Sequence, residues 1–449
     1  MRKILVSVLL GFYLLPVLFP EGLQTVTEKE AGLVLEQWLA AQNSGNFDNY
    51  SELYGVAFKG IKRSGTVSAE YNRDNWLKDR KGMFKAKMQV EARSAEITIK
   101  GKRTEIRFIQ IWASGNFKDA GTKILELEKT ENKVKILSEE MIDSYIIDSK
   151  VQQGVKADIP FILLADKFLI LTRDTEKGWR QGVMEALPGL DYPAVAAADA
   201  DPAAIPQSFR KYNNLVVNLY SSTGRRILGK ITALKMVAAV MPHFSTFEEW
   251  QRNLIENEEF TAVELGSAIW NEAGEEGHYL AAEVEYTPGE IAPGSIVMAT
   301  VFGEKELEIM KQVDVSDAGY NQVESSLNKQ HLLDPEVLSE GGWDPDAHPL
   351  DFLKEFTNSK GTHFLSLQIV LTTICSGDIE EVGNFWELGR NSLIPRVTVS
   401  GTNQLLLCFD VNGNGIPDLL FYDSFTGYTL FIDYKKAVEV DIPYHDCPC

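Results

Sequence analysis

Positive charge is scarce in this sequence. Its 44 Lys and Arg residues stand against 64 Asp and Glu residues, which gives a formal net charge of −20. Nucleic acid phosphates would repel such a chain, so nucleic acid is excluded as an expected partner. The composition, 44% apolar and 24% charged, is that of a globular protein. The length of 449 residues is enough for about three domains.

Motifs of known catalytic classes are missing. The sequence has no G-x-S-x-G, H-E-x-x-H or G-x-G-x-x-G motif, and no histidine precedes His243. The stretch from Gly224 to Lys230 fits the first seven positions of a phosphate loop, but Ile231 stands where a magnesium-binding Ser or Thr belongs. We therefore expect no nucleotide site there.

Cysteine is rare and confined to one end. The four cysteines, Cys375, Cys408, Cys447 and Cys449, all lie in the last 75 residues. In an oxidising compartment this clustering predicts one or two disulfides. Three pairings are open, and we favour a bond from Cys375 or Cys408 to the tail. A zinc half-site at Cys447 and Cys449 is the alternative.

Only the N-terminus carries a long apolar run. The basic residues Arg2 and Lys3 precede an apolar stretch from Ile4 to Phe19, which is typical of a signal peptide. We predict a signal peptide over residues 1–22 and a secreted or periplasmic protein, with an uncleaved anchor as the alternative. No second stretch is long and apolar enough to cross a bilayer.

A nine-residue stretch near the C-terminus has the spacing of a calcium loop. Calcium prefers hard oxygen ligands, which such a loop supplies at alternate positions around a glycine turn. The flanking residues have the apolar, aromatic character of buried strands, so we predict a strand–loop–strand setting. The predicted ligands are Asp410, Asn412, Asn414, the Ile416 carbonyl and Asp418.

The loop resembles the aspartate-rich calcium turns of FG-GAP and VCBS-type β repeats, whose pattern D-x-[DN]-x-[DN]-G-x-x-D it matches once. It is not an EF-hand, because Phe421 occupies the position of the bidentate glutamate. With two carboxylates, the expected dissociation constant is on the order of 10⁻⁴ to 10⁻³ M. A metal-free Asn/Gly turn is the alternative.

The N-terminal region changes from a helical pattern to a period of two. Helices are predicted from Glu28, near Tyr50 and from Arg73 to Phe84, because apolar residues recur there every three to four positions. Four antiparallel strands should follow between Met88 and Glu139. Helices followed by such a sheet predict an α+β fold.

This region is similar to a known domain family. The run from Leu35 to Tyr50, with Phe108 to Trp112 and Gly121 to Lys123, resembles nuclear transport factor two-like (SnoaL-like) domains over residues 28–142. The resemblance implies a cone formed by helices and a curved sheet, with an apolar pocket. The residues expected to line it are Trp38, Tyr50, Tyr54, Phe108, Gln110 and Trp112.

Two roles are open for the polar residues of this region. Gln110 could orient a ligand or satisfy a backbone bulge. Tyr54, Arg107 and Asp119 are the candidate acid and charge-stabilising residues if the pocket is catalytic. Adjacent acids such as Glu139 and Glu140 are interpreted as solvated or turn residues.

The remaining residues predict β-rich structure. We expect a β-rich domain over 150–310, an acidic linker over 311–360, and a β-rich domain with the calcium loop and disulfides over 361–449. Within the first of these we predict a loop from Pro193 to Pro206, a helix from Ser245 to Ile255 and strand structure from Ile269 to Tyr286.

The sequence thus predicts an exported, noncatalytic protein that binds a small apolar ligand or a protein partner and is stabilised by calcium. The alternative is an isomerase or hydrolase that acts on a small apolar molecule in the cone pocket.

Overall fold

The computed structural model divides the chain into two compact units, Met1–Ser144 and Tyr145–Cys449. The predicted signal peptide (1–22) and the predicted helix from Ser245 to Ile255 lie outside the described residues. The described residues are 25–64, 67–130, 133–152, 154–173, 178–188, 193–241, 261–287, 292, 294–333, 348–372, 379–399, 404–423 and 427–443.

Each α-helix of the first unit begins at a side chain that caps it. Thr27 and Glu30 form a capping box at the start of the first helix, and Asn46 and Asn72 accept hydrogen bonds from backbone N–H groups of the next two. These bonds satisfy donors that a helix start leaves free. The elements are α1 (Glu28–Asn43), α2 (Phe47–Glu52), α3 (Arg73–Lys81) and the 3-10 helix η1 (Met83–Lys85).

The sheet of this unit follows the order β2-β1-β6-β5-β4-β3. Strands β3 to β6 pair antiparallel, as the sequence predicted, whereas β1 pairs parallel with β6. The sequence pattern predicts neither β1 nor β2. The strands are β1 (Tyr54–Ser64), β2 (Val67–Asn72), β3 (Gln89–Lys100), β4 (Arg103–Ser114), β5 (Phe117–Thr130) and β6 (Lys133–Met141).

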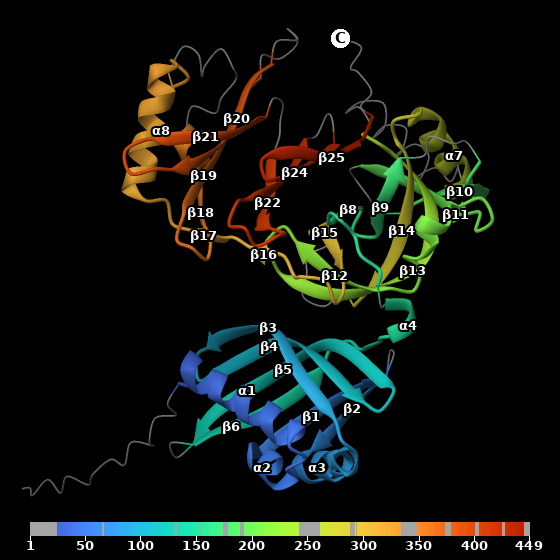
Figure 1. The fold of residues 1–449 in the computed structure, drawn as a ribbon, viewed down its shortest axis with the longest axis vertical. Coiled ribbons are helices and arrows are strands. Elements are labelled where there is room, and N and C mark those ends of the chain that lie inside the picture. The colour runs from blue at the N-terminus through green and yellow to red at the C-terminus, as the bar shows by residue number, and fades with distance from the viewer. Residues whose placement is uncertain are drawn as a thin grey trace, which may run out of the picture. The chain divides into compact units, whose positions relative to one another are not determined.

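The sheet curves around the helices, which lie along one of its faces (Figure 1). Trp38 and Tyr50 from the helices are buried with Phe58 of β1 and Phe108 of β4 in one hydrophobic cluster. The predicted α+β class, with an N-terminal cone followed by β-rich structure, is confirmed.

The second unit begins with short elements and a sheet of order β10-β11-β13-β12-β15-β8-β9-β14. Strand β13 also pairs with β14, so the pairings from β13 through β12, β15, β8, β9 and β14 close on themselves. The elements are β7 (Tyr145–Ile146), α4 (Ser149–Gln152), β8 (Phe161–Leu164), β9 (Phe168–Arg173), β10 (Arg180–Ala186), β11 (Ala194–Ala200), α5 (Gln207–Arg210), β12 (Val216–Ser221), β13 (Arg226–Val240), α7 (Ala262–Glu272), β14 (His278–Tyr286) and β15 (Ile296–Val301).

Two secondary-structure predictions for this region are wrong. The stretch from Pro193 to Pro206, predicted as a loop, contains the buried strand β11. Residues 262–272, which overlap the predicted strand from Ile269, form helix α7 instead. Alanines of β11 and β13 form the small-residue surface on which α7 packs. At Gly266 of α7 a Cβ would overlap the backbone of Met184, so only glycine permits this close approach.

Two five-stranded sheets complete the second unit. Their orders are β16-β22-β23-β24-β25 and β17-β18-β19-β20-β21. The strands are β16 (Glu308–Ile309), β17 (Lys311–Val313), β18 (Lys354–Thr357), β19 (His363–Thr372), β20 (Ile379–Leu388), β21 (Leu393–Val399), β22 (Gln404–Asp410), β23 (Asp418–Asp423), β24 (Gly427–Ile432) and β25 (Lys435–Asp441).

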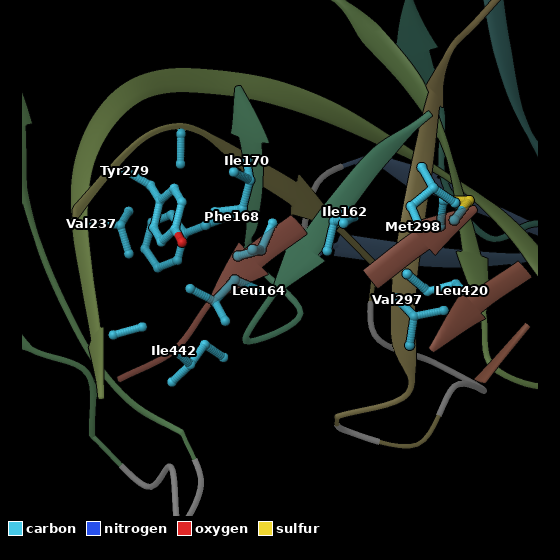
Figure 2. Packing of buried hydrophobic residues seen from close by; sticks show 14 of the residues in the cluster. Ile162, Leu164, Phe168, Ile170, Val237, Tyr279, Val297, Met298, Leu420 and Ile442 are labelled. Atoms are coloured by element: carbon cyan, nitrogen blue, oxygen red, sulfur yellow. The ribbon is translucent and has the colours of Figure 1, made fainter. Parts of the chain in front are cut away.

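The sheet that contains β22 and β23 packs on both of its faces. Leu420 and Ile442 share one core cluster with Phe168 and Tyr279 of the larger sheet (Figure 2). Residues on its opposite face, including Phe421, pack with Phe385 of the β17–β21 sheet. The strands around the predicted calcium loop are therefore buried within the second unit.

The segment predicted as an acidic linker, 311–360, contains regular structure. It holds β17, β18, helix α8 (Asp317–Lys329) and the 3-10 helix η2 (Pro349–Phe352). Val323 and Leu327 of α8 are fully buried with Leu365 and Trp386 of the sheet. The segment is polar because it covers the outside of this sheet with one apolar helix face.

Among the helices that the structure describes, none has the length and apolarity needed to cross a membrane.

Candidate functional site

The inner face of the cone can be identified from strand register. Side chains directly opposite each other in antiparallel strands lie on the same face, and alternate residues share that face. Phe108 lies opposite Lys123, and Leu125 lies opposite Glu139. Because Phe108 contacts Trp38 of α1, with ring centroids 5.7 Å apart, this is the face that meets the helices.

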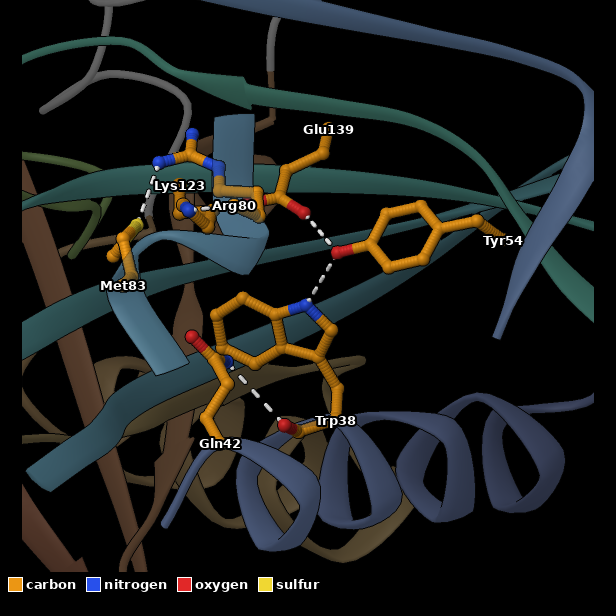
Figure 3. A network of polar contacts seen from close by, with 7 residues as sticks. All are labelled: Trp38, Gln42, Tyr54, Arg80, Met83, Lys123 and Glu139. Atoms are coloured by element: carbon orange, nitrogen blue, oxygen red, sulfur yellow. Dashed lines mark hydrogen bonds and ion pairs between the residues drawn. The ribbon is translucent and has the colours of Figure 1, made fainter. Parts of the chain in front are cut away.

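A buried hydrogen-bond network occupies this face (Figure 3). Trp38 Nε1 donates to the Tyr54 hydroxyl at 2.9 Å, and this hydroxyl donates to Glu139 Oε2 at 2.5 Å. Lys123 Nζ donates to Glu139 Oε1 at 2.5 Å. The side chains of Lys123 and Glu139 are only 6% and 1% exposed. The network is a buried ion pair whose carboxylate also accepts a hydrogen bond from a tyrosine.

Electrostatics favour the ionised form of Glu139 and the neutral form of Tyr54 in this network. Burial opposes the charge of Glu139, but Lys123 and Arg80 outweigh it and lower the pKa of the carboxyl group. Burial, followed by the charge of Glu139, raises the pKa of Tyr54 well above its ordinary value. Arg80 has its guanidinium carbon 4.0 Å from the centroid of the Trp76 ring. Glu139 is therefore ionised and Tyr54 neutral at neutral pH.

The interpretation of Glu139 as a solvated or turn residue is wrong. Glu139 is buried and paired, whereas its neighbour Glu140 forms a partly exposed ion pair with Arg63. The signal available in the sequence was an isolated Lys123 between the apolar positions of its strand. Its partner lies 16 residues away across a hairpin, so only the register brings the two together.

The structure brings the predicted pocket residues together. Trp38, Tyr50, Tyr54 and Phe108 belong to one buried cluster, and Trp112 packs against it. Tyr50 and Tyr54 have ring centroids 4.9 Å apart. These aromatic residues form the apolar wall and core of the cone.

Three buried polar atoms at one end of this face have no hydrogen-bond partner among the residues that the structure describes. They are Gln110 Oε1, Trp112 Nε1 and Asp119 Oδ1. Gln110 and Trp112 alternate along β4, and Asp119 of β5 lies opposite Trp112, so the three share the inner face. Two roles were open for Gln110, and the role of hydrogen bonding to a backbone bulge does not account for Oε1, which accepts no hydrogen bond from the described residues.

Asp119 differs from the carboxyl group of Glu139. Its Oδ2 accepts a hydrogen bond from Ser144 Oγ at 3.0 Å, and burial raises the pKa of the carboxyl group. Arg107 is one residue from Phe108 and lies opposite Ile124, so it belongs to the other face of the sheet. The candidate catalytic set of Tyr54, Arg107 and Asp119 therefore does not converge.

The chain crosses this end of the inner face after β6. A Cβ on Gly121 would overlap the carbonyl oxygen of Asp143, so the glycine permits the crossing. The Asp143 carboxylate accepts hydrogen bonds from Thr122 N at 2.6 Å and Thr122 Oγ1 at 3.1 Å. These contacts fix the segment beside Gln110 and Asp119.

The predicted calcium loop connects strands β22 and β23, which pair antiparallel. The Asp410 carboxylate accepts hydrogen bonds from Gly413 N at 2.5 Å and Gly415 N at 2.6 Å. Both glycines have positive φ, 73° and 85°, a conformation that glycine adopts without strain. The strand–loop–strand arrangement thus holds the first predicted ligand in a fixed orientation.

Two amide side chains of the loop contact Asp433, a residue that was not predicted from the sequence. Asn414 Nδ2 donates to Asp433 Oδ1 at 2.8 Å, and Asn412 Nδ2 donates to the same carboxylate at 3.3 Å. Asp418 accepts hydrogen bonds from Val411 N and Asp433 N. Asp433 lies in the turn between β24 and β25, so no local spacing links it to the loop.

The carboxylates around the loop influence one another. Burial, together with the nearby charges of Asp433 and Asp410, raises the pKa of Asp418 to about 6. Across the described part of the chain, no group of three or more His, Cys, Asp or Glu side chains is arranged to hold a metal ion. The predicted ligand set relies instead on amide and carbonyl oxygens alongside two carboxylates. This donor chemistry suits calcium.

Cys408 is a free thiol buried in the core between two sheets. Burial raises its pKa well above the ordinary value. Cys375, Cys447 and Cys449 lie outside the described residues, so the disulfide prediction is untested for them.

No protein-family model and no curated protein match this sequence. The chain is similar to Bd1075 of Bdellovibrio bacteriovorus (21% identity; 25% of this chain and 39% of that one; TM-score 0.22). It is similar to an NTF2-like protein of unknown function from Pseudomonas putida KT2440 (12% identity; 31% of this chain and 99% of that one; TM-score 0.25). It is also similar to the beta subunit of benzoate 1,2-dioxygenase from Burkholderia mallei (15% identity; 26% of this chain and 91% of that one; TM-score 0.24). These likenesses leave most of the chain without a counterpart.

Proposed function

We propose that this is an exported, noncatalytic binding protein whose cone takes up a small, largely apolar molecule carrying at least one hydroxyl or amino group. The single observation that carries the proposal is the set of three unpartnered atoms, Gln110 Oε1, Trp112 Nε1 and Asp119 Oδ1, beside an aromatic wall. Buried polar groups normally have partners, so a group that lacks one favours a bound molecule. Two acceptors and one donor suit a ligand hydroxyl, which can both donate and accept.

Binding is favoured over catalysis because the described residues of the inner face include no poised acid–base pair. The described titratable groups on the inner face are mostly committed to each other, since Lys123, Glu139 and Tyr54 form one network. Asp119 is the remaining candidate base, because burial raises its pKa. An isomerase or hydrolase that uses Asp119 is therefore the alternative.

A matched pair of small probes tests the binding proposal. We expect 4-fluorophenol to bind the full-length protein about fivefold to tenfold more tightly than fluorobenzene, because a buried hydrogen bond contributes about 1 kcal/mol. The measurement is fluorine NMR titration. Replacing Trp112 by Phe removes one donor while keeping an aromatic ring, and should reduce the preference for the phenol.

The control is Trp270→Phe, which makes an equivalent change in α7 of the second unit. Equal binding of both probes to the wild-type protein would contradict the proposal. Turnover of a hydroxylated substrate that Asp119→Asn abolishes, with substrate affinity unchanged, would favour the enzyme instead.

We also propose that the loop from Asp410 to Asp418 binds calcium and stabilises the second unit. The support is the orientation of Asp410, Asn412 and Asn414 by backbone N–H groups, which leaves further lone pairs on their oxygens. Asp433 adds a third carboxylate near the loop. The proposal is independent of ligand binding by the cone.

Calcium at 10 mM is expected to stabilise the second unit by about 1.4 to 2.7 kcal/mol, given a dissociation constant of about 10⁻⁴ to 10⁻³ M. Thermal melting with calcium and with a chelator measures the effect. Asp410→Asn should abolish most of it, whereas Asp314→Asn, at an exposed position in the same unit, should leave it intact. A wild-type melting curve that calcium does not shift would rule the site out.

A further inference from the structure

The second unit contains a cavity of about 390 Å³ that is separate from both sites described above. This volume lies within the range of natural small-molecule pockets. The cavity lies where β11 ends beside β13, next to the loop from Asp201 to Asn214. Its lining includes Gln181, Asp199, Ile205, Arg210, Asn213 and Leu234.

The loop beside this cavity is held in place by its own hydrogen bonds. Asp201 N donates to the carbonyl of Trp179 at 2.6 Å, and Asn214 N donates to the carbonyl of Ile231 at 3.1 Å. Ile205 is fully buried in a cluster with Trp179. The cavity is therefore preformed, so binding there would not require the loop to be ordered first.

Arg210 presents one edge of its guanidinium group to backbone carbonyls. Its Nε donates to the carbonyl of Ile205 at 2.6 Å, and its Nη2 donates to the carbonyl of Ala203 at 3.2 Å. A guanidinium group has five N–H donors in a planar fork, so the edge formed by Nη1 and Nη2 retains donors. No acidic residue in the described ranges forms an ion pair with Arg210.

The other charged residue of the lining is already neutralised. Asp199 accepts a hydrogen bond from Lys235 Nζ at 2.6 Å, and this ammonium group also lies 3.7 Å from Glu283. Among the described residues that line the cavity, Arg210 is thus the charged side chain without an ion-pair partner, and Ile205, Leu234 and Ala200 supply apolar surface beside it.

We propose that this cavity binds a small organic carboxylate. The carboxylate would engage the free edge of Arg210 with two parallel hydrogen bonds, which is the geometry in which arginine recognises this group. The apolar body would pack against Ile205 and Leu234. The amides of Gln181 and Asn213 would meet further polar atoms of the ligand.

Benzoate and benzamide are the probes that test this assignment, because they share an aromatic body and differ in charge. Calorimetric titration of the full-length protein should show benzoate binding at least tenfold more tightly than benzamide. Arg210→Lys keeps the charge but removes the planar fork, so it should weaken benzoate binding about tenfold. Lys211→Gln, which removes a charge from the neighbouring residue outside the lining, should leave binding unchanged.

A second variant keeps the proposal testable if Arg210→Lys disturbs the loop. Ala233→Phe fills the cavity from β13 and leaves residue 210 as arginine, so it should abolish benzoate binding while the melting temperature stays near that of the wild type. Equal affinities for benzoate and benzamide would overturn the proposal. So would benzoate binding that persists in Ala233→Phe, because the carboxylate would then lie elsewhere.

Discussion

Replacing Lys123 by Met is expected to destabilise the cone domain by about 3–5 kcal/mol. Methionine has a similar length and fits the apolar surroundings, so the loss comes from charge and not from a cavity. Glu139, 1% exposed, would keep a buried carboxylate without its closest cation. Hydrogen exchange of peptides from β4 and β5, followed against denaturant concentration in the full-length protein, measures the free energy of unfolding of this domain.

The pH dependence gives the same prediction a second readout. The folded-state pKa of Glu139 is lowered, so its stabilising contribution is present above the unfolded pKa of about 4.5 and is lost as the pH falls through the folded value. In Lys123→Met, burial would instead favour the protonated carboxyl group. The difference in stability between the two proteins should therefore be largest at and above neutral pH. It should shrink as the pH falls through the raised pKa of Glu139 in the variant, and shrink further below about pH 4.5 as the wild-type contribution is lost.

A double variant separates charge from packing. In Lys123→Met with Glu139→Met, both members of the ion pair are removed together and Arg80 loses the nearby charge of Glu139, so a large part of the lost stability should return. A deficit of about 1 kcal/mol should persist, because the Tyr54 hydroxyl loses its acceptor. A single variant as stable as the wild type would mean that the ion pair is solvated in solution.

Replacing Gly121 by Ala is expected to destabilise the same domain by about 1–3 kcal/mol or more. The new methyl group would overlap the carbonyl oxygen of Asp143, which is backbone and cannot move aside by a side-chain rotation. Displacing that segment would also strain the hydrogen bonds from Thr122 to Asp143 and from Ser144 to Asp119. Denaturant-dependent hydrogen exchange of β5 peptides measures the effect.

Gly32→Ala is the matched control in the same unit. Nothing lies within 4 Å of a Cβ at this position of α1, so the change should stabilise the domain by about 0.5–1 kcal/mol through helix propensity. Opposite signs for the two Gly-to-Ala variants would confirm the crossing at Gly121. A Gly121→Ala protein with unchanged exchange would contradict it.

Local periodicity decided which strands of the cone could be predicted from the sequence. Strands β3 to β6 alternate apolar and polar residues, so they were predicted correctly. In β1 the register with β6 shifts between Tyr54 and Lys59, which breaks the period of two, and its buried residues Tyr54 and Phe58 are spaced as in a helix. A bulged strand therefore escapes a pattern search.

Long-range pairing set the other limit. Phe108, Gln110 and Trp112 were grouped because they alternate on one predicted strand face, whereas Trp38, Tyr50 and Tyr54 followed from the family resemblance. The ion pair between Lys123 and Glu139 was not predicted, since it depends on which strands become neighbours. The same applies to Asp433, which lies next to the predicted calcium loop in a turn 15 residues after Asp418.

Whole-chain composition also concealed an asymmetry. Residues 1–144 contain 22 Lys and Arg against 19 Asp and Glu, whereas residues 145–449 contain 22 against 45. The acidic surplus thus belongs to the second unit. The net negative charge of the second unit predicts that it repels polyanions. The cone has no such negative surplus, so the same prediction does not apply to it.

Crystals of the full-length protein soaked with 4-fluorophenol test the central claim most directly. We predict electron density for the probe on the inner face of the cone, with its hydroxyl within hydrogen-bond distance of Trp112 Nε1 and of Gln110 Oε1 or Asp119 Oδ1. Density for the probe only outside the cone, with these three atoms bonded to protein groups, would contradict the account.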